Sequence, residues 1–364
     1  MIVDRLTASP LRSLESLEVD LPPGTTSIVG PNGVGKTNLL EALYFALTGR
    51  SFRTSDRREL IPHGGSLARS EVTIDAGEGT HHHLMASVTR TEGRRHLLNG
   101  AGAEPAEIAR HRPRVTVFSP DRLVLVKGPP AERRAHLDGL ISARWPARAD
   151  LRRRFGQALA QRNALISRVA AGGLAAGELD SWDHAFAHAA APLIAARDEA
   201  CEELAAPFAE AASDLGLPGR ASISYAPRAP GDPDELLAGL RERRESDIRL
   251  GRSSWGPHLD EVKLTMDDRP LRRYGSQGQQ RVCLLALLSA ERRTLLAAAG
   301  SAPLMLLDDV MSELDPGRRD HLVSHLAGAG QTLITAADQA ALPGGLAENV
   351  ISLPQAGPAH AVAA

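Results

Sequence analysis

The sequence predicts an α/β protein in which a P-loop nucleotide-binding lobe carries an antiparallel β addition and a second, compact and mainly helical lobe. Two observations predict the first lobe. Residues 30–37 read G-x-x-x-x-G-K-T directly after a β-prone run, and a second apolar run, residues 304–307, ends in two aspartates. The third observation is the helical pattern of residues 127–249, which lie between these two motifs.

The bulk composition is that of an ordinary soluble globular protein. The 364 residues are 43% apolar and 24% charged, with a formal net charge of −2. This balance argues against a wholly basic nucleic-acid-binding surface but permits a local basic patch. Cys201 and Cys283 suggest neither a disulfide framework nor a zinc site, and the N-terminus lacks an apolar signal core. No run approaches the roughly 20 apolar residues of a membrane span, so we expect a soluble, cytoplasmic protein without a membrane partner.

The first motif is the predicted nucleotide-binding loop. A β-like run, residues 26–29, precedes it and an apolar pattern at helical spacing follows it, which is the context that a P-loop requires. Its glycines let backbone N–H groups point at phosphate oxygens of ATP or GTP, Lys36 should reach the β- and γ-phosphates, and the Thr37 hydroxyl should ligate Mg²⁺. The predicted nucleotide-binding residues are Gly30, Pro31, Asn32, Gly33, Val34, Gly35, Lys36 and Thr37.

The second motif supplies the acidic residues. Residues 304–307 read as a buried parallel strand, and Asp308 at its end is expected to hold the metal together with Thr37. Asp309 stands where many such ATPases place a glutamate that polarises the attacking water, so Lys36, Asp308 and Asp309 are the predicted catalytic residues. An acidic pair after a strand is equally consistent with a plain turn. Ser312 and Asp315, in the position of a D-loop, favour the nucleotide site.

A third stretch, Ser276-Gln277-Gly278-Gln279-Gln280, resembles the signature sequence of ABC-type ATPases. A serine hydroxyl and amides at a helix N-terminus can bind a γ-phosphate. In this architecture the serine does not easily reach the P-loop of its own chain. We therefore expect Ser276, Gln277, Gly278 and Gln279 to act in trans, at the interface of a dimer that holds two ATP molecules. Taken alone, the stretch could cap any helix.

The pattern between the motifs suggests two lobes. We expect an ABC-type ATPase head formed by residues 1–122 and 252–364, and a mainly helical lobe formed by residues 123–251. β-like runs at 71–74, 86–89 and 115–118 fit the antiparallel addition, and helices are expected over 148–170 and 179–215. No sustained heptads occur, so a long coiled coil is not expected.

Several segments together resemble the RecF family of bacterial recombination-mediator ATPases, which is related to the SMC heads. They follow the family's order over nearly the whole chain: residues 30–44, 49–54, 59–61, 118–121, 127–128, 133–134, 137–138, 256–258, 274–281, 306–310 and 312–315. Two segments depart from the family pattern. The usual Asn-Phe-Arg-Asn-Tyr start keeps only Arg12, and Gly-Pro-His-Arg-Asp-Asp becomes Gly-Pro-His-Leu-Asp-Glu at 256–261.

The resemblance implies an SMC-head-like, ATP-dependent DNA-binding protein of recombinational repair and replication-fork recovery. Its implied cofactors are ATP and Mg²⁺. Its implied partners are double-stranded DNA, single-strand/duplex junctions, proteins of the RecR and RecO type that help to load recombinase, and a second copy of the chain, with a role in the SOS response.

Two other functions share parts of this pattern. An ABC-type transporter ATPase is the main alternative. Such subunits usually carry a glutamine and a histidine after two of their strands, where this chain has residues 119–121 and 336–338. Because those sensors are absent or altered, we expect slow hydrolysis, and hence a weak, DNA-stimulated ATPase used as a switch. A small-molecule P-loop kinase would have no use for residues 276–281 and 312–315.

Overall fold

The chain forms two compact units in the computed structural model. The described residues are 1–300, 302–311, 316–326, 330–339, 342–346, 349–353 and 359–360. The first unit comprises Met1–Arg122 and Leu295–Ala364, and the second comprises Leu123–Thr294. The chain passes from the first unit to the second after residue 122, where the boundary was expected, but the second unit extends beyond residue 251. It does so because the strand Glu261–Met266 pairs with the strand Ala221–Ala226 of the helical lobe.

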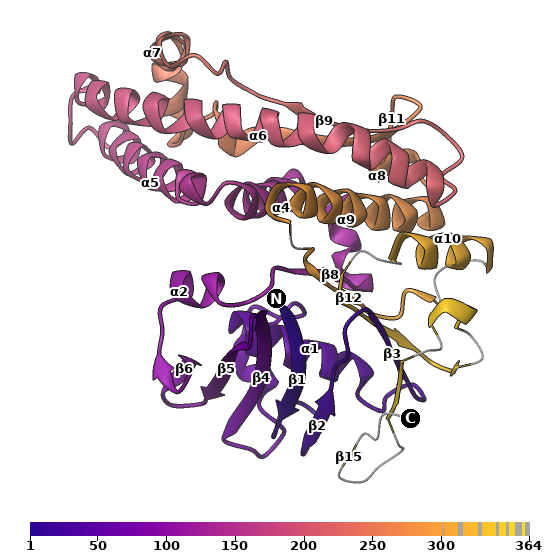
Figure 1. The fold of residues 1–364 in the computed structure, drawn as a ribbon. Helices are drawn as coiled ribbons and strands as arrows, with labels where there is room; N and C mark the ends of the chain where they lie inside the picture. Colours follow the sequence, from indigo (N-terminus) through magenta and orange to yellow (C-terminus); the bar gives the residue numbers. More distant parts are fainter. Residues whose placement is uncertain are drawn as a thin grey trace. The chain divides into compact units, whose positions relative to one another are not determined.

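The first unit contains a parallel sheet that positions the site (Figure 1). Its strand order is β14-β3-β13-β12-β8, and every neighbouring pair is parallel. The strands are β3 (Thr25–Val29), β8 (Val115–Phe118), β12 (Leu304–Leu307), β13 (Thr332–Ala336) and β14 (Val350–Ser352). All four residues of β12 are buried, as expected for a continuous apolar run in a parallel sheet.

A second, mainly antiparallel sheet completes this unit. Its order is β15-β2-β1-β4-β5-β6-β7. The strands are β1 (Ile2–Ala8), β2 (Leu17–Asp20), β4 (Leu67–Gly77), β5 (Thr80–Thr89), β6 (Gly93–Leu98), β7 (Ala101–Gly102) and β15 (Ala359–His360). The predicted runs at 71–74 and 86–89 lie in β4 and β5. The assignment of 115–118 to the antiparallel addition is wrong, because that run is β8 and pairs with β12 in parallel.

Helix α1 (Lys36–Thr48) contacts both sheets and forms the centre of the first unit's core. Its apolar face includes Leu39, Leu43 and Ala46, all fully buried. Two further helices of this unit are α2 (Pro105–Arg110) and α10 (Pro316–Leu326). Because α1 begins immediately after the glycine-rich loop, packing of this helix fixes the position of the loop.

The second unit is mainly helical, as predicted. Helices α5 and α6 lie side by side (Figure 1), within the ranges that the helical pattern predicted. The helices are α3 (Val124–Lys127), α4 (Pro130–Arg144), α5 (Leu151–Ala170), α6 (Asp180–Asp214), α7 (Pro233–Leu250), α8 (Leu271–Tyr274) and α9 (Gln277–Ala299), of which α9 belongs to this unit up to Thr294. A three-stranded antiparallel sheet, β11-β10-β9, accompanies them, formed by β9 (Ala221–Ala226), β10 (Glu261–Met266) and β11 (Arg269–Pro270).

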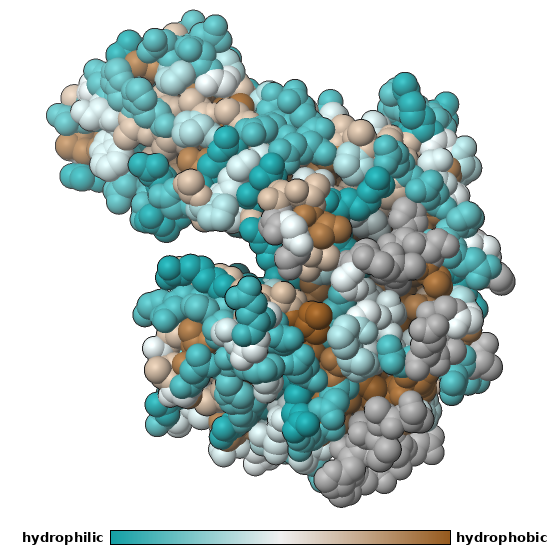
Figure 2. All heavy atoms as spheres, in the orientation of Figure 1, coloured by the Kyte–Doolittle hydropathy of each residue, from teal (hydrophilic) through white to brown (hydrophobic). Residues whose placement is uncertain are grey.

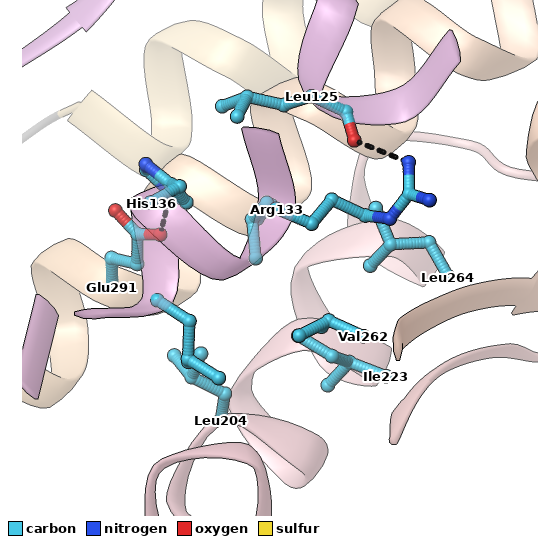
Figure 3. A pocket seen from close by; sticks show the side chains of 10 residues that line it. Leu125, Arg133, His136, Leu204, Ile223, Val262, Leu264 and Glu291 are labelled. Carbon is cyan, nitrogen blue, oxygen red and sulfur yellow. Dashed lines mark hydrogen bonds and ion pairs between the residues drawn. The ribbon is translucent and has the colours of Figure 1, made fainter. Parts of the chain in front are cut away.

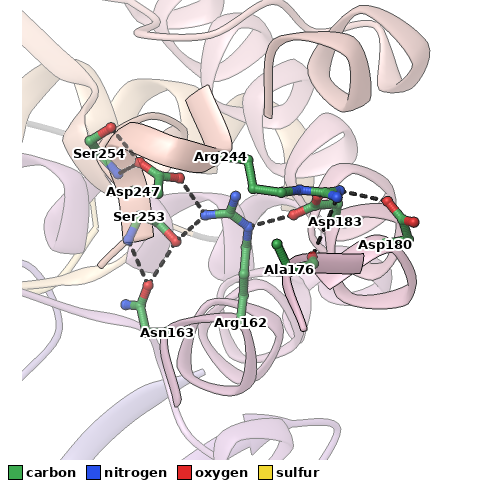
Figure 4. Close-up of polar contacts among 9 residues, drawn as sticks. All are labelled: Arg162, Asn163, Ala176, Asp180, Asp183, Arg244, Asp247, Ser253 and Ser254. Atoms are coloured by element: carbon green, nitrogen blue, oxygen red, sulfur yellow. Dashed lines mark hydrogen bonds and ion pairs between the residues drawn. The ribbon is translucent and has the colours of Figure 1, made fainter. Parts of the chain in front are cut away.

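Buried charges join three of these helices. The fully buried Arg162 of α5 donates from Nε to Asp183 of α6 at 2.8 Å and from Nη1 to Asp247 of α7 at 2.7 Å (Figure 4). A guanidinium this deep is tolerable only because two carboxylates compensate its charge.

On the face shown in Figure 2, hydrophilic residues cover most of the surface of both units. None of the helices that the structure describes is long and apolar enough to cross a bilayer.

Candidate nucleotide-binding site

The glycine-rich loop joins β3 to α1, as the sequence predicted. Strand β3 ends at Val29 and α1 begins at Lys36, so the N-terminal amides of the helix face the loop. Gly33 and Gly35 have φ angles of 86° and 109°, a left-handed conformation that favours glycine. A Cβ on Gly35 would also lie 3.1 Å from Leu14 Cδ2. These constraints explain why glycine is needed where backbone N–H groups are to surround a phosphate.

Lys36 lies against this loop. The residue is only 8% exposed, and Nζ donates to the backbone oxygens of Gly30 at 2.6 Å and Pro31 at 3.1 Å. Burial lowers the pKa of Lys36, and the nearby carboxylates of Asp309 and Asp308 partly oppose this shift. The ammonium group is therefore held between the loop and the acidic end of the sheet, where the phosphates of a bound nucleotide would lie.

Thr37 and Asp308 meet in the structure, although they are 271 positions apart in sequence. Thr37 Oγ1 donates to the two carboxylate oxygens of Asp308 at 2.9 and 3.0 Å. Asp308 is 6% exposed at the end of β12. Burial raises its pKa, with Asp309 adding to the shift, while the hydrogen bonds from Thr37 and Thr335 oppose it. A buried carboxylate next to a hydroxyl is a site that a cation would stabilise.

This donor set fits Mg²⁺. The ion prefers oxygen ligands and is usually held by one or two protein groups together with phosphates and waters. In the described part of the chain no group of three or more His, Cys, Asp or Glu side chains could form a metal cage. Thr37 and Asp308 are oxygen donors of the kind that this ion prefers.

Asp309 occupies a strained position next to Asp308. Its φ is 51°, a left-handed value that aspartate adopts more readily than most residues. Its backbone N–H donates to Thr335 Oγ1 at 2.8 Å, and its side chain is half-buried. The turn thus directs consecutive carboxylates differently: Asp308 is buried at the end of the strand, and Asp309 is more accessible.

Sequence reasoning missed Thr335 as a site residue. Its Oγ1 donates to Asp308 Oδ1 at 3.1 Å and accepts the N–H of Asp309, so one hydroxyl connects both aspartates. Thr335 lies on β13, beside β12. A β-branched residue in a buried strand is ordinary for a core, and only the pairing of β12 with β13 indicates its role.

A second group that sequence reasoning missed surrounds the fully buried Glu41 of α1. Arg12 donates to it from Nε at 2.8 Å and from Nη2 at 3.0 Å, and Arg53 from Nη1 at 3.4 Å. Arg53 also donates to Asn38 at 3.1 Å, one residue after Thr37. The signal was present in the sequence, since Glu41 is a lone charge within an apolar helical pattern.

Ser276 immediately precedes helix α9 and caps its start in the second unit. Gln279 N donates to Ser276 Oγ at 3.2 Å, and Ser276 N donates to Gln279 Oε1 at 2.7 Å. This reciprocal pair is a capping box, with glutamine at the third helical position. Ser276 and Gln277 are exposed, and Gly278 and Gln279 are half-buried. The capped helix start thus leaves Ser276 and Gln277 exposed.

The remaining predicted positions divide into two groups. Ser312 and Asp315 lie outside the described residues. Residues 119–121, at the first sensor position, follow β8 and begin with the buried Ser119, and residues 336–338, at the second, run from the end of β13 to the exposed Asp338. None of these residues is the glutamine or the histidine of the transporter pattern.

Other segments that carried the family resemblance have structural contacts in the second unit. Arg133 of α4 donates to Leu125 O at 3.3 Å and to Glu261 of β10 at 2.8 Å, and His136 pairs with Glu291 of α9 (Figure 3). Asp138 accepts a hydrogen bond from Arg197 Nε of α6 at 2.8 Å. These contacts connect α4 to α6, β10 and α9, which is a further reason why the unit extends past residue 251.

Comparison with known proteins identifies the family. The family described as RecF/RecN/SMC N terminal domain matches residues 2–354. A protein of Streptomyces avermitilis named DNA replication and repair protein RecF is 36% identical, with 95% of this chain and 96% of the relative covered. A protein of the same name from an Anaeromyxobacter species is 37% identical, with 92% of each chain covered.

Solved structures agree with the fold. One described as the recombination mediator protein RecF-ATP in the RecFOR pathway has a TM-score of 0.85 and 25% identity, over 97% of this chain and 95% of the other. An SMC head bound to the C-winged helix domain of ScpA has a TM-score of 0.61 and 17% identity, over 100% and 98%. The predicted SMC-head-like fold class is confirmed, and the transporter alternative is not favoured. The chain belongs to the RecF family of DNA replication and repair proteins.

Proposed function

We propose that this protein is an ATP-gated DNA-binding dimer that acts in recombinational repair and replication-fork recovery. The observation that carries the proposal is the hydrogen-bonded contact of Thr37 with Asp308, beside the loop that holds Lys36. It unites a phosphate-binding loop and an acidic strand end in a chain whose relatives are named for DNA replication and repair.

Within one chain, different residues are proposed to bind the phosphates, to hold the metal ion and to accept a proton from water. The amides of residues 30–37 and the Lys36 ammonium bind and orient the β- and γ-phosphates. Thr37 and Asp308 would hold Mg²⁺, which supplies charge neutralisation at these phosphates. Asp309 is proposed to accept a proton from the attacking water, and Thr335 holds its backbone in position for that role.

The second half of each site is proposed to come from another copy of the chain. The Ser276 hydroxyl accepts the N–H of Gln279, so its own proton remains available to donate to a γ-phosphate oxygen. Gln277, Gly278 and Gln279 add the positive end of the α9 dipole. Ser312 and Asp315 are proposed to contribute as a D-loop. Because each chain has both half-sites, a dimer holds two ATP molecules.

Hydrolysis is proposed to be slow and to release the dimer from DNA. Residues 119–121 and 336–338 stand at the two sensor positions without the usual glutamine and histidine, and Asp309 is one methylene shorter than the usual glutamate. We propose a weak ATPase, stimulated by DNA, whose product state is the separated monomer. Rapid steady-state turnover without DNA would contradict this role.

The proposed partners follow from the family. They are double-stranded DNA and single-strand/duplex junctions, bound through phosphates with little base readout, together with proteins of the RecR and RecO type. The RecFOR pathway of the solved relative supports the two protein partners. A role in the SOS response and a cytoplasmic location belong to the same proposal.

Sedimentation velocity with ATP, with ADP and without nucleotide, each with and without gapped DNA, tests the proposal. The wild type should dimerise with ATP only and bind DNA as the dimer. Lys36→Met should lose nucleotide binding and dimerisation. Ser276→Arg should bind ATP but stay monomeric, while Ser213→Arg, at an exposed serine near the end of α6, should behave as wild type. An ATP-dependent dimer of Ser276→Arg would refute the composite site.

A further inference from the structure

Four arginines of the first unit gather around the C-terminal end of α1. Arg50 follows Gly49, the residue that caps the helix, and Arg57 begins a short 3₁₀ helix, Arg57–Leu60. Arg94 of β6 packs over the cap, since a Cβ on Gly49 would lie 2.9 Å from Arg94 Nη1. Arg112 precedes β8 and lies close enough to Arg50 for the two positive charges to repel each other. We call Arg50, Arg57, Arg94 and Arg112 the arginine cluster.

The members of the cluster repel one another. Burial lowers the pKa of Arg94, Arg57 and Arg50 lower it further, and Glu104 offsets only part of the effect. Burial likewise lowers the pKa of Arg112, Tyr44 opposes part of this shift, and Arg50 and Arg114 add to it. Partial burial and like charges both disfavour the charged form, so this arrangement has an electrostatic cost in the isolated chain.

Neighbouring arginines are arranged differently. Arg58, next to Arg57, pairs with Asp56 at 3.0 Å, and Arg12 and Arg53 share the carboxylate of Glu41. In the part of the chain that the structure describes, no carboxylate lies within 4.0 Å of the guanidinium nitrogens of the arginine cluster. The cluster is thus a concentration of positive charge in a protein whose net charge is −2.

Two simpler sources of negative charge, the α1 dipole and a bound nucleotide, do not explain the arginine cluster. Attraction to the C-terminal end of the α1 dipole can account for Arg94, which lies on the cap, but it acts only within the last turn of a helix. Bound nucleotide is also excluded as the compensating anion. The 13 residues of α1 place its end about 20 Å from the phosphate-binding loop at its start.

We propose that the arginine cluster is a contact surface for the phosphate backbone of duplex DNA. Guanidinium groups match phosphate oxygens bidentately, and several in one patch need an anion with closely spaced charges. Duplex DNA provides one charge per roughly 1.7 Å of its axis. The assignment rests on the proposed function and adds the location of a DNA contact, at the opposite end of α1 from the nucleotide.

Fluorescence anisotropy of a labelled 30-base-pair duplex, titrated with full-length protein and ATP over a range of salt concentrations, tests the assignment. The test variant is Arg50→Gln/Arg57→Gln, which leaves Arg94 and Arg112 in place. Loss of two phosphate contacts should reduce the salt slope by roughly 1.8 and weaken binding about tenfold. Binding of a fluorescent ATP analogue should be unchanged. The matched control is Arg58→Gln, which removes an adjacent arginine that already has an acidic partner.

The outcomes separate the assignment from the proposed function. If the wild type fails to bind DNA with ATP, the proposed function is refuted and the assignment with it. If the wild type binds and the double variant keeps its affinity and salt slope, only the assignment fails. An equal loss for Arg58→Gln would also overturn it, because general positive charge would then explain the effect. A tenfold loss confined to the double variant, with intact nucleotide binding, supports the arginine cluster.

Discussion

Ser276 has two separable tasks, and the capping box allows each to be removed alone. In the structure its Oγ accepts the N–H of Gln279, while the Gln279 side chain accepts the N–H of Ser276. Ser276→Ala removes the cap and should cost about 1 kcal/mol of stability. Ser276→Asp retains a capping acceptor and adds a charge that the helix N-terminus favours, so the free energy of unfolding should stay close to that of the wild type.

The same aspartate should abolish the ATP-dependent dimer. In the proposed composite site it would face a γ-phosphate, and two like charges about 4 Å apart at an effective dielectric constant of about 20 repel by about 4 kcal/mol. That energy corresponds to roughly a thousandfold weaker association at each half-site.

Urea unfolding and sedimentation velocity with ATP measure the two effects separately. Ser276→Ala should be less stable and form a weakened dimer. Ser276→Asp should be as stable as the wild type and monomeric. If Ser276→Asp dimerises with ATP as the wild type does, the serine does not face a phosphate and the reasoning fails.

Three other predictions follow from buried polar groups. Because burial raises the pKa of Asp308, its ionised form carries a cost that is absent at low pH and complete once the pH exceeds the folded-state pKa. Asp308→Asn should therefore increase the free energy of unfolding of the nucleotide-free protein at pH 7, and urea titrations should show this gain disappearing on acidification. The same variant should lose stabilisation by Mg²⁺ and ATP. Thr335→Val should raise the Mg²⁺ concentration needed for ATP turnover by about tenfold, since it removes the hydroxyl that orients both aspartates; an unchanged Mg²⁺ dependence would contradict its role. Arg162→Met should lower the free energy of unfolding in urea by about 3–5 kcal/mol, because it leaves Asp183 and Asp247 without their shared partner. The control Arg58→Met, at an exposed ion pair, should change the free energy of unfolding by less than about 1 kcal/mol.

Local patterns predicted the elements of the site well. The glycine-rich loop, the strand before it and the acidic strand end each have a signal within about ten residues, and β3, α1 and β12 lie where those signals placed them. The long helices α5 and α6 were equally visible, because their apolar stripes persist over many turns.

Features that depend on pairing between distant segments were not visible. The run at 115–118 was identified as a strand, but nothing in four apolar residues tells which sheet will accept it. The same limit hid Thr335, whose role depends on β13 lying beside β12. The end of the second unit was also obscured, because it depends on β10 pairing with β9 across 34 intervening residues, including α7.

The position of Lys36 has a practical consequence for studying the protein. The chain has only three lysines, and the other two, Lys127 and Lys263, are exposed. Among the lysines, an amine-reactive reagent followed by mass spectrometry would therefore report on two accessible reference sites and one site at the P-loop. The lowered pKa of Lys36 increases the fraction of its amine that is neutral and reactive, and a bound nucleotide would cover that amine. The ratio of Lys36 labelling to that of the other two lysines therefore reports how much of the site is occupied by nucleotide.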